Sequence, residues 1–145
     1  MSEHLSILRE LFSHEDSWKE EDFVHSFADP KQVVLSWSVF FPKFEIVKGH
    51  VVLGPISSEQ QEKLAALESL EKQDELLRSF RWCEVPYQFA ERASTEGSHD
   101  LYLATLMAES WLMNLKHHFP HQTWKTRVLS AEETGSVVGV SFENT

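Results

Sequence analysis

The residues best suited to chemistry gather in the run HHFPH, which holds His117, His118 and His121. Neutral imidazole nitrogen is a common ligand for zinc, nickel and copper, so clustered histidines are candidate metal ligands. The spacing matches neither HExxH nor a zinc-finger pattern. Adjacent histidines on a helix diverge by about 100°, so His117 and His118 cannot easily share one ion. We therefore expect the run to form a polar helix end without a cofactor, and we keep His117 and His121 as the metal candidates.

Glu109 is the one formal charge between residues 101 and 115. A carboxylate among apolar side chains is a candidate general base, and a nearby histidine such as His121 is a candidate partner for it. The alternative is a strip that faces solvent, because Thr105, Glu109 and Lys116 fall on roughly one side of a helix. The sequence favours the strip, and Glu109 and His121 remain the catalytic candidates.

Cys83 is the single cysteine, which excludes an internal disulfide and fits a reducing compartment. The nearby cation Arg81 favours a reactive thiol, but a small buried residue is the commoner role of a free cysteine. The tryptophans offer another chemistry, a pocket for a small apolar ligand in which Trp37 or Trp111 lines a cavity. We expect core packing instead, which is their commoner role. The five are Trp18, Trp37, Trp82, Trp111 and Trp124.

Acidic residues dominate the start of the chain. Residues 1–30 hold eight acids against Arg9 and Lys19, in a chain of net charge −10. Such a surface repels the phosphates of nucleic acid and attracts a basic protein, although it also serves solubility alone. The predicted protein-binding residues are Glu10, Glu15, Asp16, Glu20, Glu21 and Asp22.

A helix at about 99–118 is predicted to be the centre of the fold. Its apolar residues face almost every direction, which is typical of a buried helix. Ser98 can serve as N-cap, and Asp100 suits the positive end of the helix dipole. Pro120 cannot continue the helix.

Two β-hairpins are predicted, at about 44–53 and 122–142. In the first, Lys48-Gly49 forms a two-residue turn, for which Gly49 supplies a positive φ. In the second, Trp124, Thr126 and Val128 alternate with polar residues. Its last strand has an inner face made of Val138, Val140 and Phe142, reached through an acidic loop at 131–136.

Further helices are predicted at 2–13, at 18–27, and from a capping box at Ser57 or Ser58. The last of these carries Leu64, Leu67 and Leu70, and a second part at Leu76, Leu77 and Phe80 either continues it or follows a bend. Residues 30–41 fit either a helix or a strand by pattern. The pair Asp29-Pro30 decides for helix, since it matches an N-cap followed by proline at the first helical position. Residues 81–85 are expected to be a connector, followed by a short helical turn from Pro86.

Together these elements predict one α+β domain over residues 1–145, with a small and mostly antiparallel sheet packed against helices. The N-terminus has no apolar signal region, and no run approaches the roughly 18 apolar residues of a membrane span. We therefore expect a cytoplasmic protein that neither enters a membrane nor binds nucleic acid.

The preferred hypothesis is a non-catalytic interaction module, of the inhibitor, immunity or adaptor kind, that binds a basic protein. The first alternative is a metal-dependent or acid/base enzyme in which Glu109 meets His117, His121, His50 or His99 in a cleft. The second is a binder of a small apolar ligand. The sequence contains no GxGxxG, P-loop, GxSxG or CxxC motif, which disfavours the common nucleotide enzymes.

Overall fold

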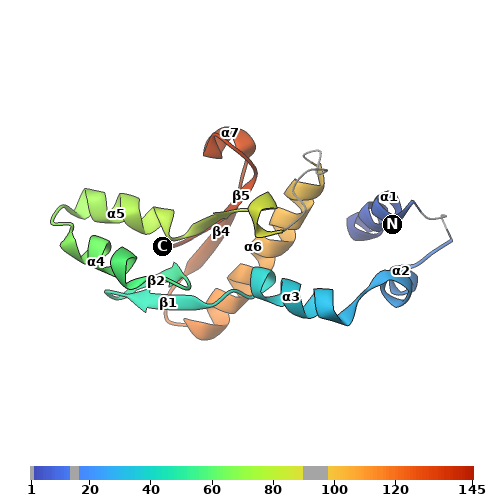
Figure 1. Cartoon of the computed structure of the whole chain (residues 1–145), viewed down its shortest axis with the longest axis horizontal. Coiled ribbons are helices and arrows are strands. Elements are labelled where there is room, and N and C mark those ends of the chain that lie inside the picture. The colour runs from blue at the N-terminus through green and yellow to red at the C-terminus, as the bar shows by residue number, and fades with distance from the viewer. Residues whose placement is uncertain (1, 14–16, 90–97) are drawn as a thin grey trace. The chain divides into compact units, whose positions relative to one another are not determined.

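The computed structural model describes residues 2–13, 17–89 and 98–145. Within these ranges the chain forms seven α-helices, one short 3-10 helix and five strands in two antiparallel sheets (Figure 1), which confirms the predicted α+β class. Contacts between Cα atoms divide the chain into two compact units. We call Met1–Trp37 unit 1 and Ser38–Thr145 unit 2. One domain over the whole chain stays a prediction.

Unit 1 contains α1 (Glu3–Phe12) and α2 (Glu20–Phe27), as the sequence predicts, with α2 beginning two residues later than expected. Their first turns are joined by a hydrogen bond that the Ser2 hydroxyl donates to the Glu20 carboxylate. Their last residues are joined by the stacked rings of Phe12 and Phe27, whose centroids are 4.6 Å apart. Because start meets start and end meets end, the two helices run in the same direction.

The interior of unit 1 is a cluster of aromatic rings. Phe23 is buried, and its ring centroid lies 6.0 Å from that of Phe12 and 5.2 Å from that of Trp18. Arg9 Nη2 donates a hydrogen bond of 3.0 Å to the carbonyl of Trp18, which fixes the return segment between the helices. Aromatic pairs of this kind contribute about 0.5–1.5 kcal/mol each beyond their burial.

Helix α3 (Pro30–Phe40) confirms the helical choice for this segment. The Asp29 carboxylate accepts a hydrogen bond of 2.9 Å from the amide of Lys31, and the Asp29 carbonyl accepts one from Val33. The helix ends before Pro42, which cannot continue it. Unit 2 begins within this helix, at Ser38.

The predicted first hairpin is present as β1 (Phe44–Val47) and β2 (His50–Leu53). Both turn residues are left-handed, with φ of 54° at Lys48 and 80° at Gly49. This is the two-residue turn whose twist matches that of the flanking strands.

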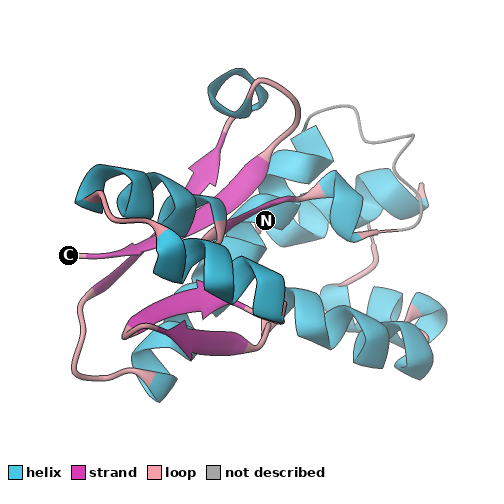
Figure 2. Cartoon of the chain, turned by 60° about the vertical axis from the view of Figure 1, so that its left-hand side comes forward, coloured by secondary structure: helices cyan, strands magenta, loops and turns pink. Residues whose placement is uncertain are grey.

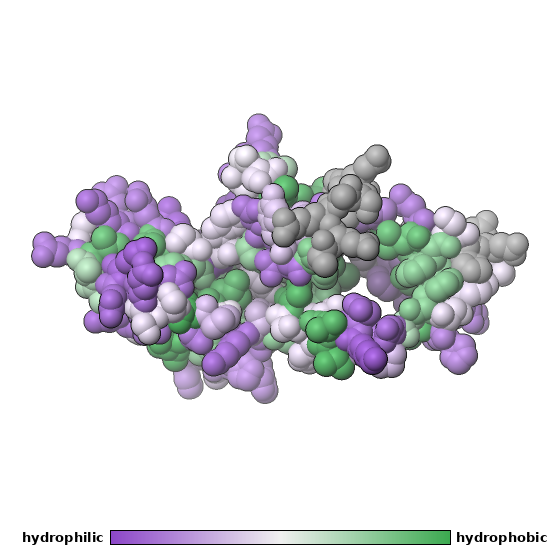
Figure 3. All heavy atoms as spheres, in the orientation of Figure 1, coloured by the Kyte–Doolittle hydropathy of each residue, from purple (hydrophilic) through white to green (hydrophobic). Residues whose placement is uncertain are grey.

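Helices α4 (Ser58–Ala66) and α5 (Leu70–Ser79) follow the hairpin. The predicted capping box is at Ser57, whose hydroxyl accepts a 3.1 Å hydrogen bond from the Gln60 amide. Both helices bury leucine against the hairpin, in the cluster Val47, Val52, Leu64 and Leu77. Figure 3 shows mainly hydrophilic residues, in purple, over the outer surface of α4 and α5.

The second sheet has the strand order β3-β5-β4, all antiparallel, and Figure 2 shows it separate from the hairpin. The predicted second hairpin is confirmed by β4 (Trp124–Leu129) paired with β5 (Gly139–Asn144). Two expectations beside it are wrong. The supposed connector forms β3 (Trp82–Glu84), which pairs with β5, and the acidic loop contains the short helix α7 (Ala131–Thr134). The predicted turn at Pro86 is the 3-10 helix η1 (Pro86–Gln88).

Four hydrogen bonds at Phe80 and Arg81 tie the two sheets together. The amide of Leu53 in β2 donates to the Phe80 carbonyl, and Arg81 Nε donates to the Val51 carbonyl. The amide of Phe142 in β5 donates to the Arg81 carbonyl, and Arg81 Nη1 donates to Asn144 Oδ1. The short segment between α5 and β3 is therefore bonded to both sheets.

Helix α6 (Ser98–His118) is the predicted central helix, and it runs along β4 and β5 (Figure 1). Its buried face consists of Ala104, Met107, Ala108, Trp111 and Leu115. The opposite side is open at Met113, and Leu101 in the first turn is exposed as well, so the helix is not buried all round. The helix begins at Ser98, but the side chain of this residue is not described, so its capping role stays a prediction.

Two polar groups of α6 are anchored on the last turn of α3 and on the proline that follows it. Trp111 Nε1 donates a 2.9 Å hydrogen bond to the Val39 carbonyl, and Asn114 Nδ2 donates to that of Pro42. No helix among the described residues is long and apolar enough to cross a bilayer.

Candidate functional site

The histidines at the end of α6 do not form a site with Glu109. His117, His118 and His121 are all exposed, and the first two meet edge to face with ring centroids 4.9 Å apart. Within the described ranges, no three His, Cys, Asp or Glu side chains are grouped closely enough to hold a metal ion. The convergence that the enzyme hypothesis requires is therefore not met by these residues.

Glu109 itself is exposed on α6. Thr105 and Lys116 are exposed as well, which matches the solvent-facing strip offered as the alternative. The other histidines in that hypothesis lie apart in the fold, because His50 begins β2 and His99 is in the first turn of α6.

The tryptophans serve mainly as packing residues. Trp111 and Trp124 are buried, and both rings meet Phe142 with centroids about 6 Å away. Trp18 and Trp82 are half-buried, and Trp37 is exposed on α3. The pocket lined by Trp37 or Trp111 that we considered for an apolar ligand stays a prediction.

Cys83 lies on β3 opposite Val140 of β5. Burial raises the pKa of this thiol to about 12, so it is protonated at neutral pH. Because the thiolate is the reactive form, the environment favours the packing role over the reactive one.

The predicted acidic surface is described only in part, since Glu15 and Asp16 lie outside the described residues. Glu20, Glu21 and Asp22 form the first turn of α2 and are exposed. Asp22 Oδ2 accepts a 2.8 Å hydrogen bond from the backbone amide of Lys19, which gives this amide an acceptor at the start of the helix. Glu10 is exposed on α1.

The parallel course of α1 and α2 adds an acid that the sequence analysis did not place there. Glu3 is in the first turn of α1, and the bond from Ser2 to Glu20 brings the two first turns together. Two helix starts at one end of unit 1 combine their positive dipole ends, which carboxylates stabilise. We call this surface, made of Glu3, Glu20, Glu21 and Asp22, the acidic end.

Unit 2 has a second candidate that the sequence analysis did not single out, the guanidinium of Arg81. Only 6% of this residue is exposed, and among the described residues no carboxylate forms an ion pair with it. Its two hydrogen bonds, each 2.8 Å, go to neutral oxygens, the Val51 carbonyl and Asn144 Oδ1. Its Cζ lies 5.5 Å from the centre of the Phe142 ring, within reach of a cation–π interaction.

Burial lowers the pKa of Arg81, and the charges of Asp74 and Glu143 act in the opposite direction. The sequence signal for this residue is a lone cation between Phe80 and Trp82 directly after a helix. This signal indicates a buried cation only when β3 is known, because that strand begins at the next residue and holds Arg81 in the interior.

Arg81 lines a groove of about 850 Å³ in unit 2. Its walls come from the end of α5, from all three strands of the second sheet, from α7 and from His50 at the start of β2. The charged lining residues besides Arg81 are three acids of α5 and β5 (Asp74, Glu75 and Glu143), the cation Arg78, and the pair Arg127 and Glu133. The groove also contains the half-buried indole of Trp82 and the hydroxyl of Ser141.

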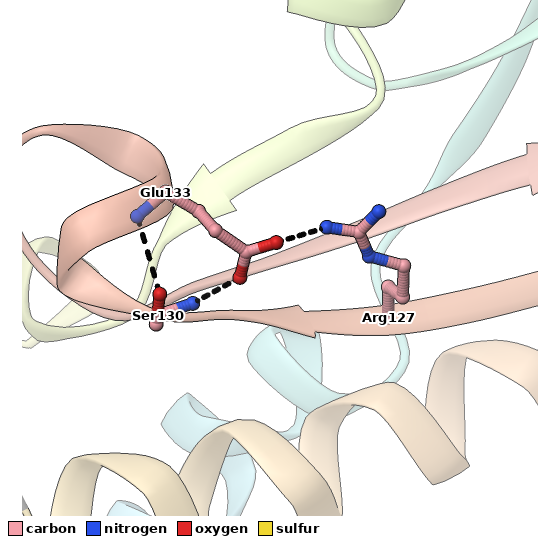
Figure 4. A network of polar contacts seen from close by, with 3 residues as sticks. All are labelled: Arg127, Ser130 and Glu133. Atoms are coloured by element: carbon pink, nitrogen blue, oxygen red, sulfur yellow. Dashed lines mark hydrogen bonds and ion pairs between the residues drawn. The ribbon is translucent and has the colours of Figure 1, made fainter.

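A polar network fixes the α7 side of this groove (Figure 4). The Ser130 hydroxyl accepts a 3.1 Å hydrogen bond from the Glu133 amide, and the Ser130 amide donates to the Glu133 carboxylate. Arg127 of β4 forms an ion pair with the other carboxylate oxygen. The charges of Arg127 and Glu133 are therefore paired with each other.

No protein-family model, curated protein or solved structure matches the chain.

Proposed function

We propose that the protein is a non-catalytic interaction module, of the inhibitor, immunity or adaptor kind, which binds a basic protein through the acidic end of unit 1. The observation that supports this function is the gathering of Glu3, Glu20, Glu21 and Asp22 at the joined starts of α1 and α2. Lys19, the N-cap residue of α2, directly precedes three of these acids. Charge of this density speeds association with an oppositely charged partner, and the attraction weakens as the salt concentration rises.

The proposed partner is a protein rather than nucleic acid. Residues 1–37 hold eight acids and three cations, which opposes binding to phosphate. We also propose that the protein acts in the cytoplasm, and the single protonated thiol of Cys83 supports a reducing compartment.

The test measures binding of the full chain to a lysine decapeptide by calorimetry, at low and at physiological salt. The double variant Glu20→Gln, Glu21→Gln should bind about fivefold more weakly at low salt, because two carboxylates of the acidic end are lost. The matched control is Glu59→Gln, Glu62→Gln, which removes two exposed carboxylates from the early part of α4.

The control variant should keep the affinity of the wild type within about twofold. Equal weakening of both variants would mean that only net charge attracts the peptide, and the proposal would then fail. Far-ultraviolet circular dichroism of each variant verifies that α2 and α4 are intact.

A further inference from the structure

Arg81 has hydrogen-bonding capacity that the chain does not use. A guanidinium carries five N–H donors, and the chain accepts two of them, at Val51 and Asn144. Nη2 has no hydrogen bond to any described residue, yet it is not among the fully enclosed polar atoms that lack a partner. The small exposed part of this buried residue therefore opens into the groove that it lines.

The other cations of the groove each have an acid nearby. Arg127 is paired with Glu133, and Arg78 lies one helical turn after Asp74 on α5. At the edge of the groove, Glu143 faces Lys125 across the β4–β5 ladder. In the part of the chain that the structure describes, the acceptors bonded to Arg81 are both neutral oxygens, so it is the cation of the groove best placed to receive an anion.

The charge around Arg81 decides which anion fits. Asp74 and Glu143 are near enough to act on its charge, and Glu75 and Glu133 line the same groove. A phosphate carries nearly two negative charges and would be repelled by these carboxylates. A carboxylate carries one charge and has two coplanar oxygens that match the fork of a guanidinium.

The same acids favour a cationic group on the ligand. Asp74 and Glu143 line the groove together with Arg81, so an amine or guanidinium beside the bound carboxylate would meet opposite charge. A basic residue at the end of a peptide carries both groups. The groove volume of about 850 Å³ falls within the range of sites that enclose a ligand larger than one amino acid.

We propose that the groove of unit 2 binds a peptide segment ending in lysine or arginine, with its terminal carboxylate on Arg81 and its basic side chain toward Asp74 and Glu143. Trp82 supplies an apolar wall for the stem of that side chain. The site lies wholly in unit 2 and is independent of the acidic end.

The test uses the full chain and two forms of the peptide Ala-Ala-Ala-Lys, with a free terminal carboxylate or with a terminal amide. Binding is measured by calorimetry and by amide chemical-shift changes. Amidation should weaken binding at least about tenfold, because it removes a charge-assisted hydrogen bond. Equal affinity of the two forms would overturn the proposal.

Two further ligands separate the possible sources of the carboxylate. Free lysine should bind at least about tenfold more weakly than the tetrapeptide, since it fills little of the groove. Inorganic phosphate should not compete with the peptide. Equal binding of free lysine, or competition by phosphate, would overturn the choice of a peptide terminus.

The variant Arg81→Lys tests the role of the guanidinium. It should reduce the ratio between free-acid and amide affinities to about one, whereas loss of structure would weaken both forms and keep their ratio. The matched control is Arg78→Lys on the rim, which should keep the wild-type ratio.

If Arg81→Lys does not fold, the shift changes in the wild type locate the site. Asn144 and Ser141 should respond to the free acid, and Ser6 of unit 1 should not. Absence of a response at Asn144 would overturn the proposal.

Discussion

Burial acts in opposite ways on two residues of one short segment. It lowers the pKa of the Arg81 guanidinium and raises that of the Cys83 thiol to about 12, in each case favouring the neutral form. The cysteine responds by staying protonated and packing against the sheet. The arginine stays charged, so its burial needs acceptors, which Val51, Asn144 and the two aromatic rings supply.

Residue identity alone could not distinguish these roles. The chemistry of their side chains makes Glu109, His117 and His121 candidate catalytic or metal-binding residues, yet all three lie exposed on or beside α6. The core roles of Trp111 and Trp124 followed from their size and apolarity. The role of Arg81 cannot be predicted from its neighbours in the sequence, because its two hydrogen-bond acceptors lie 30 and 63 positions away in the chain.

Glu133 provides a pH-dependent prediction at the residue scale. Its pKa is lowered chiefly by the hydrogen bond from the Ser130 amide and further by Arg127. A carboxylate with a lower pKa in the folded state stabilises that state above its unfolded pKa, and this contribution is lost as pH falls through the folded pKa.

We therefore expect the carboxyl carbon of Glu133, followed by NMR, to titrate below the ordinary glutamate range. The Ser130 amide signal should shift with the same midpoint. A midpoint equal to that of the urea-unfolded chain would contradict the capping geometry at α7.

At the scale of elements, local sequence signals located most of the structure. The Asp29-Pro30 pair, the Ser57 capping box and the Lys48-Gly49 turn each act over a few residues, and each is present. Strand β3 was missed because three residues cannot display a period of two. Its existence depends on pairing with β5, more than fifty residues later.

Two substitutions in the hairpin turn should change the stability of unit 2 in opposite directions. Lys48 has φ 54°, which asparagine tolerates better than lysine, so Lys48→Asn should stabilise unit 2 by about 0.5 kcal/mol. Gly49 has φ 80° with open space around its Cβ position, so Gly49→Ala should cost about 1 kcal/mol through the backbone alone.

Urea unfolding monitored by tryptophan fluorescence measures both variants. Changes of the same sign in the two variants would show that the turn does not have this conformation. Lys63→Asn, on the exposed face of α4, is the control for the loss of a lysine.

At the scale of the whole molecule, the division into two units was not predicted. The sequence showed a compositional change, with acids concentrated in residues 1–30, and it was interpreted as a surface property. The contacts instead give the first 37 residues an aromatic interior of their own, around Phe23. Single-sequence patterns locate helices, but they do not reveal which helices share a core.

This division predicts that unit 2 does not require α1 and α2. A chain starting at Asp29 keeps α3 together with its capping residue, and the main core of unit 2, from Val51 to Phe142, lies entirely after that point. It should unfold cooperatively in urea, with a smaller denaturant slope because less surface is exposed on unfolding.

Near-ultraviolet circular dichroism of the shortened chain should retain the signal of a rigid Trp111. A broad transition without that signal would show that unit 1 is needed for the packing of unit 2.

The bonds at Phe80 and Arg81 have a consequence for how unit 2 exchanges its amide protons with solvent. The Leu53 amide of one sheet and the Phe142 amide of the other both end on carbonyls of this dipeptide. Fraying of β1 or of β4 alone would leave both of these hydrogen bonds intact, so it would not expose either amide to solvent. Both should therefore exchange through a shared subglobal opening, at matched rates that change together when this dipeptide is perturbed.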